Sequence, residues 1–240
     1  MTVRVQSQDP DAEKGSMSTL VKIPAGHRMV LGSRSSRRRE LLELLVPGDQ
    51  IMVVPPQVTD EPGFDGITDW EGIESQLQKI VHEKSDDVRD QLSSRNLPQD
   101  LADILGIVCG DTEVVVEEPD SGALKVLGQP SSDHWKEDVT EWFEKYLTGR
   151  THWAVTYVAI TTLRGQRTSR FVKTAVTFSA DAQHWLENYL KTEESMGKAG
   201  GYGLQAGGSL FVEKIEGSPS NVIGLPLKET AQLLEELLSP

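Results

Sequence analysis

Four arginines stand close together in the segment Leu31–Leu42, which reads LGSRSSRRRELL. They follow a short apolar run ending at Gly32, and the serines among them are suited to cap a helix. The start of a helix favours an anion, and arginine binds phosphate in a bidentate manner. The segment therefore predicts a phosphate-binding cradle that includes Ser33, Arg37 and Arg38, although a solvated basic turn fits the same spacing equally well.

Acidic residues at two positions have the character of catalytic or metal-binding groups. Asp60 and Glu61 follow a predicted strand, where carboxylates can bind Mg²⁺ together with a substrate phosphate. Asp111 follows Gly110 within an apolar run and has the chemistry of a general base or a metal ligand. A solvated loop carboxylate and an ordinary turn aspartate remain open as alternatives on these features alone.

Cationic and amide side chains occupy two further candidate positions. Lys84 falls on the buried stripe of a predicted helix, where its ammonium group needs an anion or a path to water along its own stem. The glycine-rich segment 198–208 carries Lys198 and Gln205, and its glycines permit close approach to a ligand. Gln205 offers a donor and an acceptor to a base edge, whereas a loop that binds nothing is the alternative.

Hydrophobic periodicity predicts the elements that must position these residues. Strands and helices alternate and a hairpin lies in the middle, so the fold class is α/β with a mixed β-sheet flanked by helices. Residues 1–26 are predicted to be a flexible N-terminal extension in which STLVKI is able to lie against the body, and 27–240 one domain. Strands are expected at 28–32, 50–56, 123–130, 151–163, 170–179 and 210–217. Residues 104–118 are expected to form two strand-like runs, with a break at Cys109–Thr112. Helices are expected after Ser33 through Leu45, and over Trp70–Leu92, Trp135–Tyr146, Trp185–Leu190 and 228–238.

Composition excludes several classes of function. The chain has 240 residues, a net charge of −13 and one cysteine. A strongly acidic chain is unsuited to a nucleic acid polymer, and no apolar run approaches the length of a membrane span. The single cysteine fits a reducing compartment, so a cytoplasmic location is expected. No H-E-x-x-H, C-x-x-C or G-x-S-x-G motif occurs, so neither a zinc site nor a nucleophile elbow is indicated.

Taken together, these segments resemble the Maf family of nucleoside triphosphate pyrophosphatases. The family signature L-A-S-x-S-P-R-R-x-E-L-L is similar to LGSRSSRRRELL, and the A-D-T element is similar to Gly110–Thr112. The acidic pair, the lysine of HEKS and the later K-A-G-x-Y-G-I-Q-G and V-G-L-P elements also have counterparts, in the family's order, between Met29 and Leu238. One departure is Gln129, which stands where the family's G-K-P element has a lysine.

The resemblance implies an elongated fold with two lobes around a cleft, related to the inosine triphosphate pyrophosphatases. It also implies hydrolysis of dTTP or UTP to the monophosphate and pyrophosphate, as a house-cleaning activity that uses a divalent cation (Mg²⁺, Mn²⁺ or Co²⁺). A homodimer is the family expectation. A 7-methyl-GTP branch and a non-catalytic nucleotide-binding regulator of cell division remain alternatives. The implied catalytic residues are Asp111 as proton acceptor, Lys84 and Glu61, with Glu61 and Asp111 on the metal. The implied substrate-binding residues are Ser33, Arg37, Arg38, Thr112, Lys198 and Gln205.

Overall fold

The computed structural model describes residues 20–57, 61–94 and 102–239. Within these ranges seven strands form one sheet in the order β2-β1-β3-β5-β6-β7, and β4 pairs with β3 beside that path. β1 is parallel to β2 and β3, and the remaining pairs are antiparallel, so the predicted mixed sheet is confirmed. The strands are β1 (Arg28–Leu31), β2 (Ile51–Val53), β3 (Ile104–Glu117), β4 (Leu124–Leu127), β5 (Thr151–Thr161), β6 (Arg167–Phe178) and β7 (Val212–Glu216).

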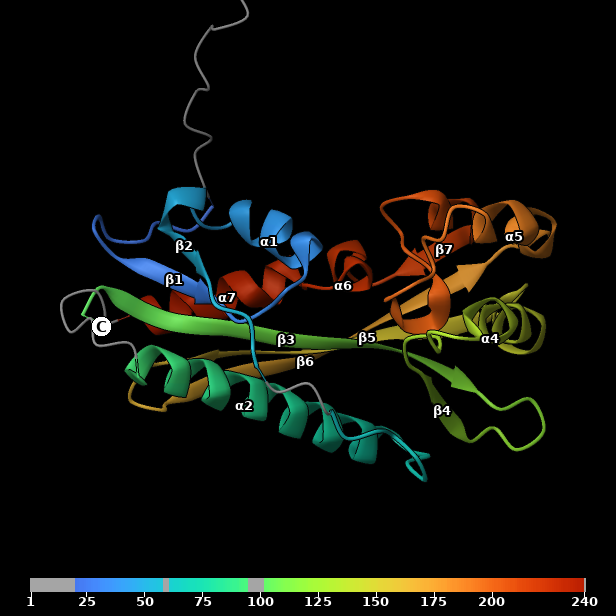
Figure 1. Cartoon of the computed structure of the whole chain (residues 1–240), viewed down its shortest axis with the longest axis horizontal. Helices are drawn as coiled ribbons and strands as arrows, with labels where there is room; N and C mark the ends of the chain where they lie inside the picture. Colours follow the sequence, from blue (N-terminus) through green and yellow to red (C-terminus); the bar gives the residue numbers. More distant parts are fainter. Residues whose placement is uncertain (1–19, 58–60, 95–101, 240) are drawn as a thin grey trace, which may run out of the picture.

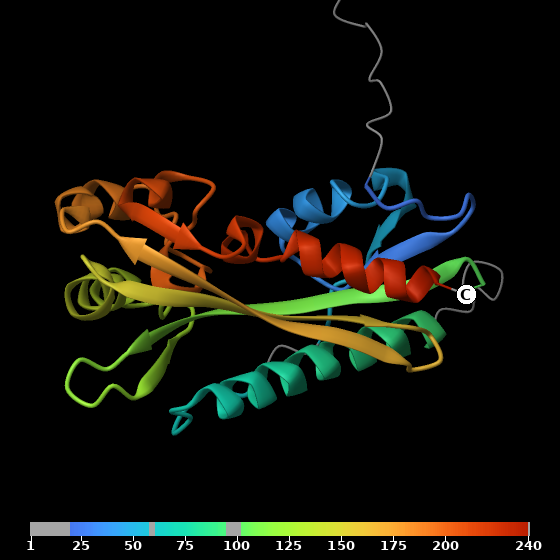
Figure 2. The ribbon, with the colours of Figure 1, turned by 180° about the vertical axis from the view of Figure 1, so that it is seen from behind.

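Helices cover both faces of this sheet (Figure 1). The long helix α2 lies along one face; on the other, α1 and α7 lie near the end that carries β1, and α6 lies toward the middle. α4 and α5 gather at the opposite end of the long strands, and the view from behind gives the same grouping (Figure 2). The helices are α1 (Ser36–Glu43), α2 (Trp70–Ser94), α4 (Trp135–Trp142), α5 (Ala182–Leu190), α6 (Pro219–Ile223) and α7 (Leu227–Leu238).

Three hydrophobic clusters correspond to these groups of elements. Alternate side chains of β3, among them Ile107 and Val115, pack against the apolar stripe of α2. The next cluster lies between the β1 end of the sheet and the helices α1 and α7. The last one joins α4, α5 and the far ends of β3 and β6 through aromatic residues such as Phe143 and Phe178. The long strands therefore form a rigid support that connects both ends of the molecule.

β3 corrects the prediction of two runs broken at Cys109–Thr112. It is one strand of 14 residues, because residues 107–115 pair without interruption with β5. On the other edge its partner changes, from β1 along 104–108 to β4 along 114–117. In the described part of the chain, residues 109–113 thus have a strand partner on one edge only. The sequence features that suggested a break mark this opening in the sheet.

The boundaries of two other segments add to the sequence predictions. The helix predicted through Tyr146 has two parts, because α4 continues as a π-helical turn at Phe143–Leu147 before Gly149 turns the chain with a positive φ. Val21 and Ile23, from the STLVKI segment, are buried in the cluster beneath α1 and α7. Residues 1–19 lie outside the described residues, so the extension at 1–26 stays a prediction. No helix that the structure describes has the length and apolar character needed to cross a membrane.

Candidate functional site

A cavity of about 690 Å³ opens beside the free edge of β3. Five cationic side chains line it, from residues 34, 37, 38, 84 and 198, together with three carboxylates, from residues 61, 111 and 113. The cavity is therefore cationic in a chain whose net charge is −13. The structure brings all of the predicted site residues to it except Asp60, which lies outside the described residues. Those lining it are Ser33, Arg37, Arg38, Glu61, Lys84, Asp111, Thr112, Lys198 and Gln205.

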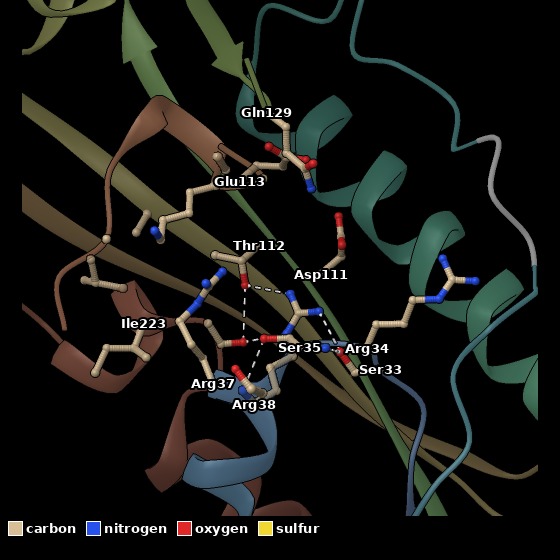
Figure 3. A pocket seen from close by; sticks show the side chains of 18 of the residues that line it. Ser33, Arg34, Ser35, Arg37, Arg38, Asp111, Thr112, Glu113, Gln129 and Ile223 are labelled. Atoms are coloured by element: carbon tan, nitrogen blue, oxygen red, sulfur yellow. Dashed lines mark hydrogen bonds between the residues drawn. The ribbon is translucent and has the colours of Figure 1, made fainter. Parts of the chain in front are cut away.

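Arg38 is fixed at the start of α1 by a set of hydrogen bonds (Figure 3). Ser35 caps the helix, its hydroxyl accepting from the backbone N–H of Arg38 at 3.3 Å. The guanidinium Nε of Arg38 donates to the carbonyl of Gly224 at 2.9 Å. Its other nitrogens donate to Ser33 Oγ at 3.4 Å and to Thr112 Oγ1 at 3.3 Å. Arg38 thus joins α1, β3 and the turn after α6 at the cavity wall.

The other three arginines of the cluster have different surroundings. Arg37 lines the cavity and makes no hydrogen bond or ion pair within residues 20–57, 61–94 and 102–239. Burial and the neighbouring charge of Arg38 lower the pKa of Arg37. Arg34 donates to the carbonyl of Pro56 at 2.9 Å. Arg39 is not part of the cavity lining; it is exposed and pairs with a glutamate one turn further along α1.

Lys84 links α2 to β3 through two carboxylates. Its Nζ donates to Asp111 Oδ1 at 2.7 Å and lies 2.9 Å from Glu61 Oε1. The side chains of Lys84 and Asp111 are only 12% and 11% exposed, whereas that of Glu61 is 42% exposed. The ammonium group on the apolar stripe therefore has the anion that its position requires. Asp111 Oδ2 is buried and has no hydrogen-bond partner in the structure.

Glu113 is a site residue that the sequence analysis missed. It lines the cavity, and its Oε2 is buried with no hydrogen-bond partner in the described part of the chain. Burial, reinforced by the charges of Asp111 and Glu61, raises its pKa well above the usual range, although Lys84 opposes this shift. A signal was available, because side chains two residues apart in a strand share a face, and Glu113 follows Asp111 by two in a buried run.

Thr112 points to the opposite side of β3 from Asp111 and Glu113, as alternation in a strand requires. Its hydroxyl bonds with Thr156 at 2.9 Å and accepts from Arg38. Both faces of one strand therefore contribute to a single cavity. The missing strand partner along residues 109–113 makes this possible, because the cavity extends across the open edge of the sheet.

The glycine-rich loop is held against the sheet from behind. Gly200 and Gly201 have φ of +66° and +70°, and a Cβ at Gly200 would come within 2.8 Å of Val114. Behind the loop, Nε2 of the buried His152 forms a hydrogen bond of 2.8 Å with the hydroxyl of Tyr202. The loop thereby presents Lys198 to the cavity together with an exposed Gln205. Lys198 Nζ donates to the carbonyl of Glu194, and burial and the charge of Arg37 lower its pKa.

The donor chemistry of the cavity suits a hard divalent cation. Carboxylate and amide oxygens are available from Glu61, Asp111, Glu113 and Gln129, and two of the carboxylate oxygens are buried without partners. Over the described residues, however, no group of three or more His, Cys, Asp or Glu side chains is arranged to hold a metal ion. Mg²⁺ usually takes one or two carboxylates and completes its shell with water and substrate phosphates. The residues present fit a cation of that kind.

An α/β sheet with a cationic cavity across its open edge defines a protein suited to binding a small polyanion. The Maf-like protein family model matches residues 28–237, so the chain belongs to the Maf-like family. The dTTP/UTP pyrophosphatase of Nitrosomonas europaea is 32% identical over 89% of this chain and 96% of its own. The dTTP/UTP pyrophosphatase of Syntrophus aciditrophicus is also 32% identical, over 88% of this chain and 90% of its own.

One solved structure is similar to part of this chain. The nucleoside-triphosphatase / dITP/XTP pyrophosphatase of Mycobacterium abscessus aligns with 64% of this chain and 75% of its own, at 12% identity and a TM-score of 0.36. A similarity of this size does not establish kinship, so the relation to inosine triphosphate pyrophosphatases stays a prediction. The roles of the individual site residues also stay predictions, since their placement in one cavity does not test them.

Proposed function

We propose that this chain hydrolyses nucleoside triphosphates, with dTTP and UTP preferred, to the monophosphate and pyrophosphate. The observation that carries the proposal is the convergence of five cationic side chains and three carboxylates, from motifs far apart in the sequence, on one cavity. The Maf-like relatives named dTTP/UTP pyrophosphatase, which align over most of the chain, support the choice of reaction and substrate.

The triphosphate binds between the start of α1 and the glycine-rich loop. Arg37, whose guanidinium has no partner among the described residues, and Arg38, whose guanidinium is fixed, bind phosphate oxygens, with Lys198 opposite. Ser33 and the first turn of α1 add hydroxyl and backbone donors, which favour an anion. Gln205 faces the base, where its amide can pair with a pyrimidine edge. A cleft of this kind concentrates a positive field even in an acidic protein.

Asp111 acts as the proton acceptor for the attacking water. Lys84 bonds to Oδ1, which orients the carboxylate, while Oδ2 has no hydrogen-bond partner among the described residues. Water that loses its proton to Oδ2 attacks the α-phosphorus, and the bond to the bridging oxygen breaks so that pyrophosphate leaves. Arg37, Arg38 and Lys84 stabilise the negative charge that develops on the phosphate oxygens. Asp111, Lys84 and Arg38 thus act from positions fixed by hydrogen bonds.

A divalent cation, when bound, supplies Lewis-acid stabilisation of the phosphate charges. The sequence predicts Glu61 and Asp111 as its ligands, and both carboxylates are bound to Lys84 Nζ in this structure. Because Asp111 has one oxygen without a partner, proton acceptance and cation binding compete for Oδ2. We also extend the proposal to a cytoplasmic homodimer, for which the family expectation and the single cysteine are the support.

The test is a nucleotide panel with product identification, comparing the wild type with Asp111→Asn. dTTP, UTP, CTP and 7-methyl-GTP are incubated with Mg²⁺, Mn²⁺ or Co²⁺, and the products are separated. We expect the monophosphate and pyrophosphate from dTTP and UTP, and a loss of kcat of about 10²- to 10⁴-fold in Asp111→Asn. Preference for 7-methyl-GTP would move the chain to the other branch. No turnover with any cation would support the non-catalytic regulator instead.

A further inference from the structure

A second cavity, of about 670 Å³, adjoins the first. It lies between the segment 61–68 and the strand β4, and its lining shares only three residues with the lining of the first cavity: Glu61, Glu113 and Gln129. These three residues therefore mark the boundary between the two cavities. Each has a side-chain oxygen suited to Mg²⁺ or Mn²⁺, two from carboxylates and one from an amide.

Glu113 lacks the counter-charge that its neighbours have. Lys84 pairs with Asp111 and Glu61, and no residue that the structure describes makes a hydrogen bond or ion pair with the buried Oε2 of Glu113. That oxygen lies 3.9 Å from the position a Cβ would take at Gly128, which places the carboxylate against the residue that precedes Gln129. A buried carboxylate without a partner is costly, so a ligand that supplies positive charge is favoured here.

The unpartnered Oδ2 of Asp111, in a residue only 8% exposed, is a second observation that points to a ligand. If Asp111 accepts a proton from water, the cation needs another protein carboxylate, and Glu113 lies on the same face of β3. Glu61 contacts Lys84 through Oε1, which leaves Oε2 for a further ligand. These carboxylate oxygens therefore favour the binding of a cation at the boundary between the two cavities, near Lys84.

We propose that Glu113, with Glu61 and the amide oxygen of Gln129, binds a divalent cation at this boundary, and that the triphosphate completes its coordination shell. Two carboxylates, an amide oxygen and phosphate oxygens form an all-oxygen set of the kind Mg²⁺ and Mn²⁺ accept. The proposal deepens the proposed function and rests on it for the nucleotide. In this proposal Asp111 accepts the proton and Glu113 binds the cation. Oδ2 of Asp111 then no longer has to do both.

The experiment counts Mn²⁺ bound to the full chain by electron paramagnetic resonance, in the presence of a dTTP analogue with a non-hydrolysable α,β-bridge. Glu113→Gln keeps the shape of the side chain and removes its charge, and we expect its Mn²⁺ affinity to fall about tenfold or more. Gln129→Lys places an ammonium group beside Glu113, and we expect a similar loss. Glu118→Gln is the matched control, because this carboxylate lines only the second cavity and pairs with Lys125.

Wild-type Mn²⁺ affinity in both Glu113→Gln and Gln129→Lys, with circular dichroism showing folded protein, would overturn the proposal. An equal loss in Glu118→Gln would also overturn it, since the effect would then be one of general charge. The count is independent of turnover, so the two proposals fail separately. If the chain hydrolyses dTTP and Glu113→Gln still binds Mn²⁺ as the wild type does, the cation site is refuted and the proposed reaction stands. A chain without turnover that still loses Mn²⁺ in Glu113→Gln refutes the reaction and keeps the cation site.

Discussion

At the scale of single residues, the ammonium group of Lys84 pairs with two of the three carboxylates of the cavity, Asp111 and Glu61. Lys84 neutralises part of the charge of Asp111 and Glu61, while Glu113 stays without a partner. Burial and these two neighbours raise the pKa of Glu113 well above its usual range. The folded state therefore holds the proton of this carboxyl to a higher pH than the unfolded state does. Such a cost to folding is typical of a site arranged for a ligand.

The pH dependence of stability tests this account of Glu113. A carboxyl with a raised folded pKa costs stability as pH rises above about 4.5, its unfolded value, toward the folded value. In a chelator, Glu113→Gln should therefore exceed the wild type in unfolding free energy at pH 8 by about 1–3 kcal/mol. The difference should disappear near pH 4, where the carboxyl is protonated in both states. Urea unfolding at the two pH values measures it.

Glu117→Gln is the control for that prediction. Glu117 lies on the same strand but is exposed, so its substitution should leave the unfolding free energy close to wild type at both pH values. A Glu113→Gln protein that is less stable than the wild type at pH 8 would contradict the argument.

Residue identities in the site were predictable from the sequence, but their partners were not. Lys84 was singled out because a lysine on an apolar stripe needs an anion, and it has two. Glu113 was missed because its run was taken as an ordinary strand. The register of β3 against β4 determines which residues lie beside Glu113, and no spacing rule along the chain predicts that register.

At the scale of elements, the edge of β3 and the glycine-rich loop form the site together. β3 loses one partner over residues 109–113, and the loop closes against the same strand a few residues further on. The side chain of Val114 on β3 packs against the backbone of Gly200. The glycine-rich loop is therefore in direct contact with the strand that carries Asp111. Substitutions at this contact should affect binding as well as stability.

Gly200→Ala tests the packing of the loop. The new Cβ would lie 2.8 Å from Val114 at a φ of +66°, so both strain and overlap are introduced. We expect a loss of about 1–3 kcal/mol in unfolding free energy and a rise in the KM for dTTP, because Lys198 and Gln205 move with the loop. Urea unfolding and steady-state kinetics measure the two effects.

Gly197→Ala separates strain from overlap. Gly197 has the same φ of +66°, but a Cβ there would meet nothing within 4 Å. We expect only the cost of a left-handed alanine, about 1 kcal/mol, and a KM near that of the wild type. If the two variants raised KM equally, the contact with Val114 would have no part in positioning the loop.

Elements with a regular hydrophobic period were predictable from the sequence. A short helix and an interrupted pattern were not. The hairpin β5–β6 and the helix α2 follow strong patterns of period two and period 3.6, which burial enforces. The helix α6 has five residues, too few to show a period, and was missed. The continuity of β3 was also missed, because Gly110 and Asp111 suggested a break while pairing with β5, a partner distant in sequence, keeps the strand intact.

At the scale of the whole molecule, the aromatic cluster behind the loop stabilises the end of the sheet opposite β1. His152 is buried among Phe178 and Tyr202, and its ring contacts both edge-on. Burial lowers the pKa of His152 to about 3, so the ring is neutral in the folded protein. In the unfolded chain its pKa returns to about 6.5. The folded state therefore resists a proton that the unfolded state accepts.

This histidine should make the protein sensitive to mild acid. Its contribution to stability is present above about pH 6.5 and is lost as pH falls toward the folded value, by about 2 kcal/mol between pH 7 and pH 5. His152→Phe removes the titrating group, so its unfolding free energy should fall by about 2 kcal/mol less than that of the wild type over this interval. Tyr202→Phe breaks the same hydrogen bond but keeps the imidazole, and should retain the wild-type difference. Urea unfolding at the two pH values decides, and an unchanged acid sensitivity in His152→Phe would place its cause elsewhere in the molecule.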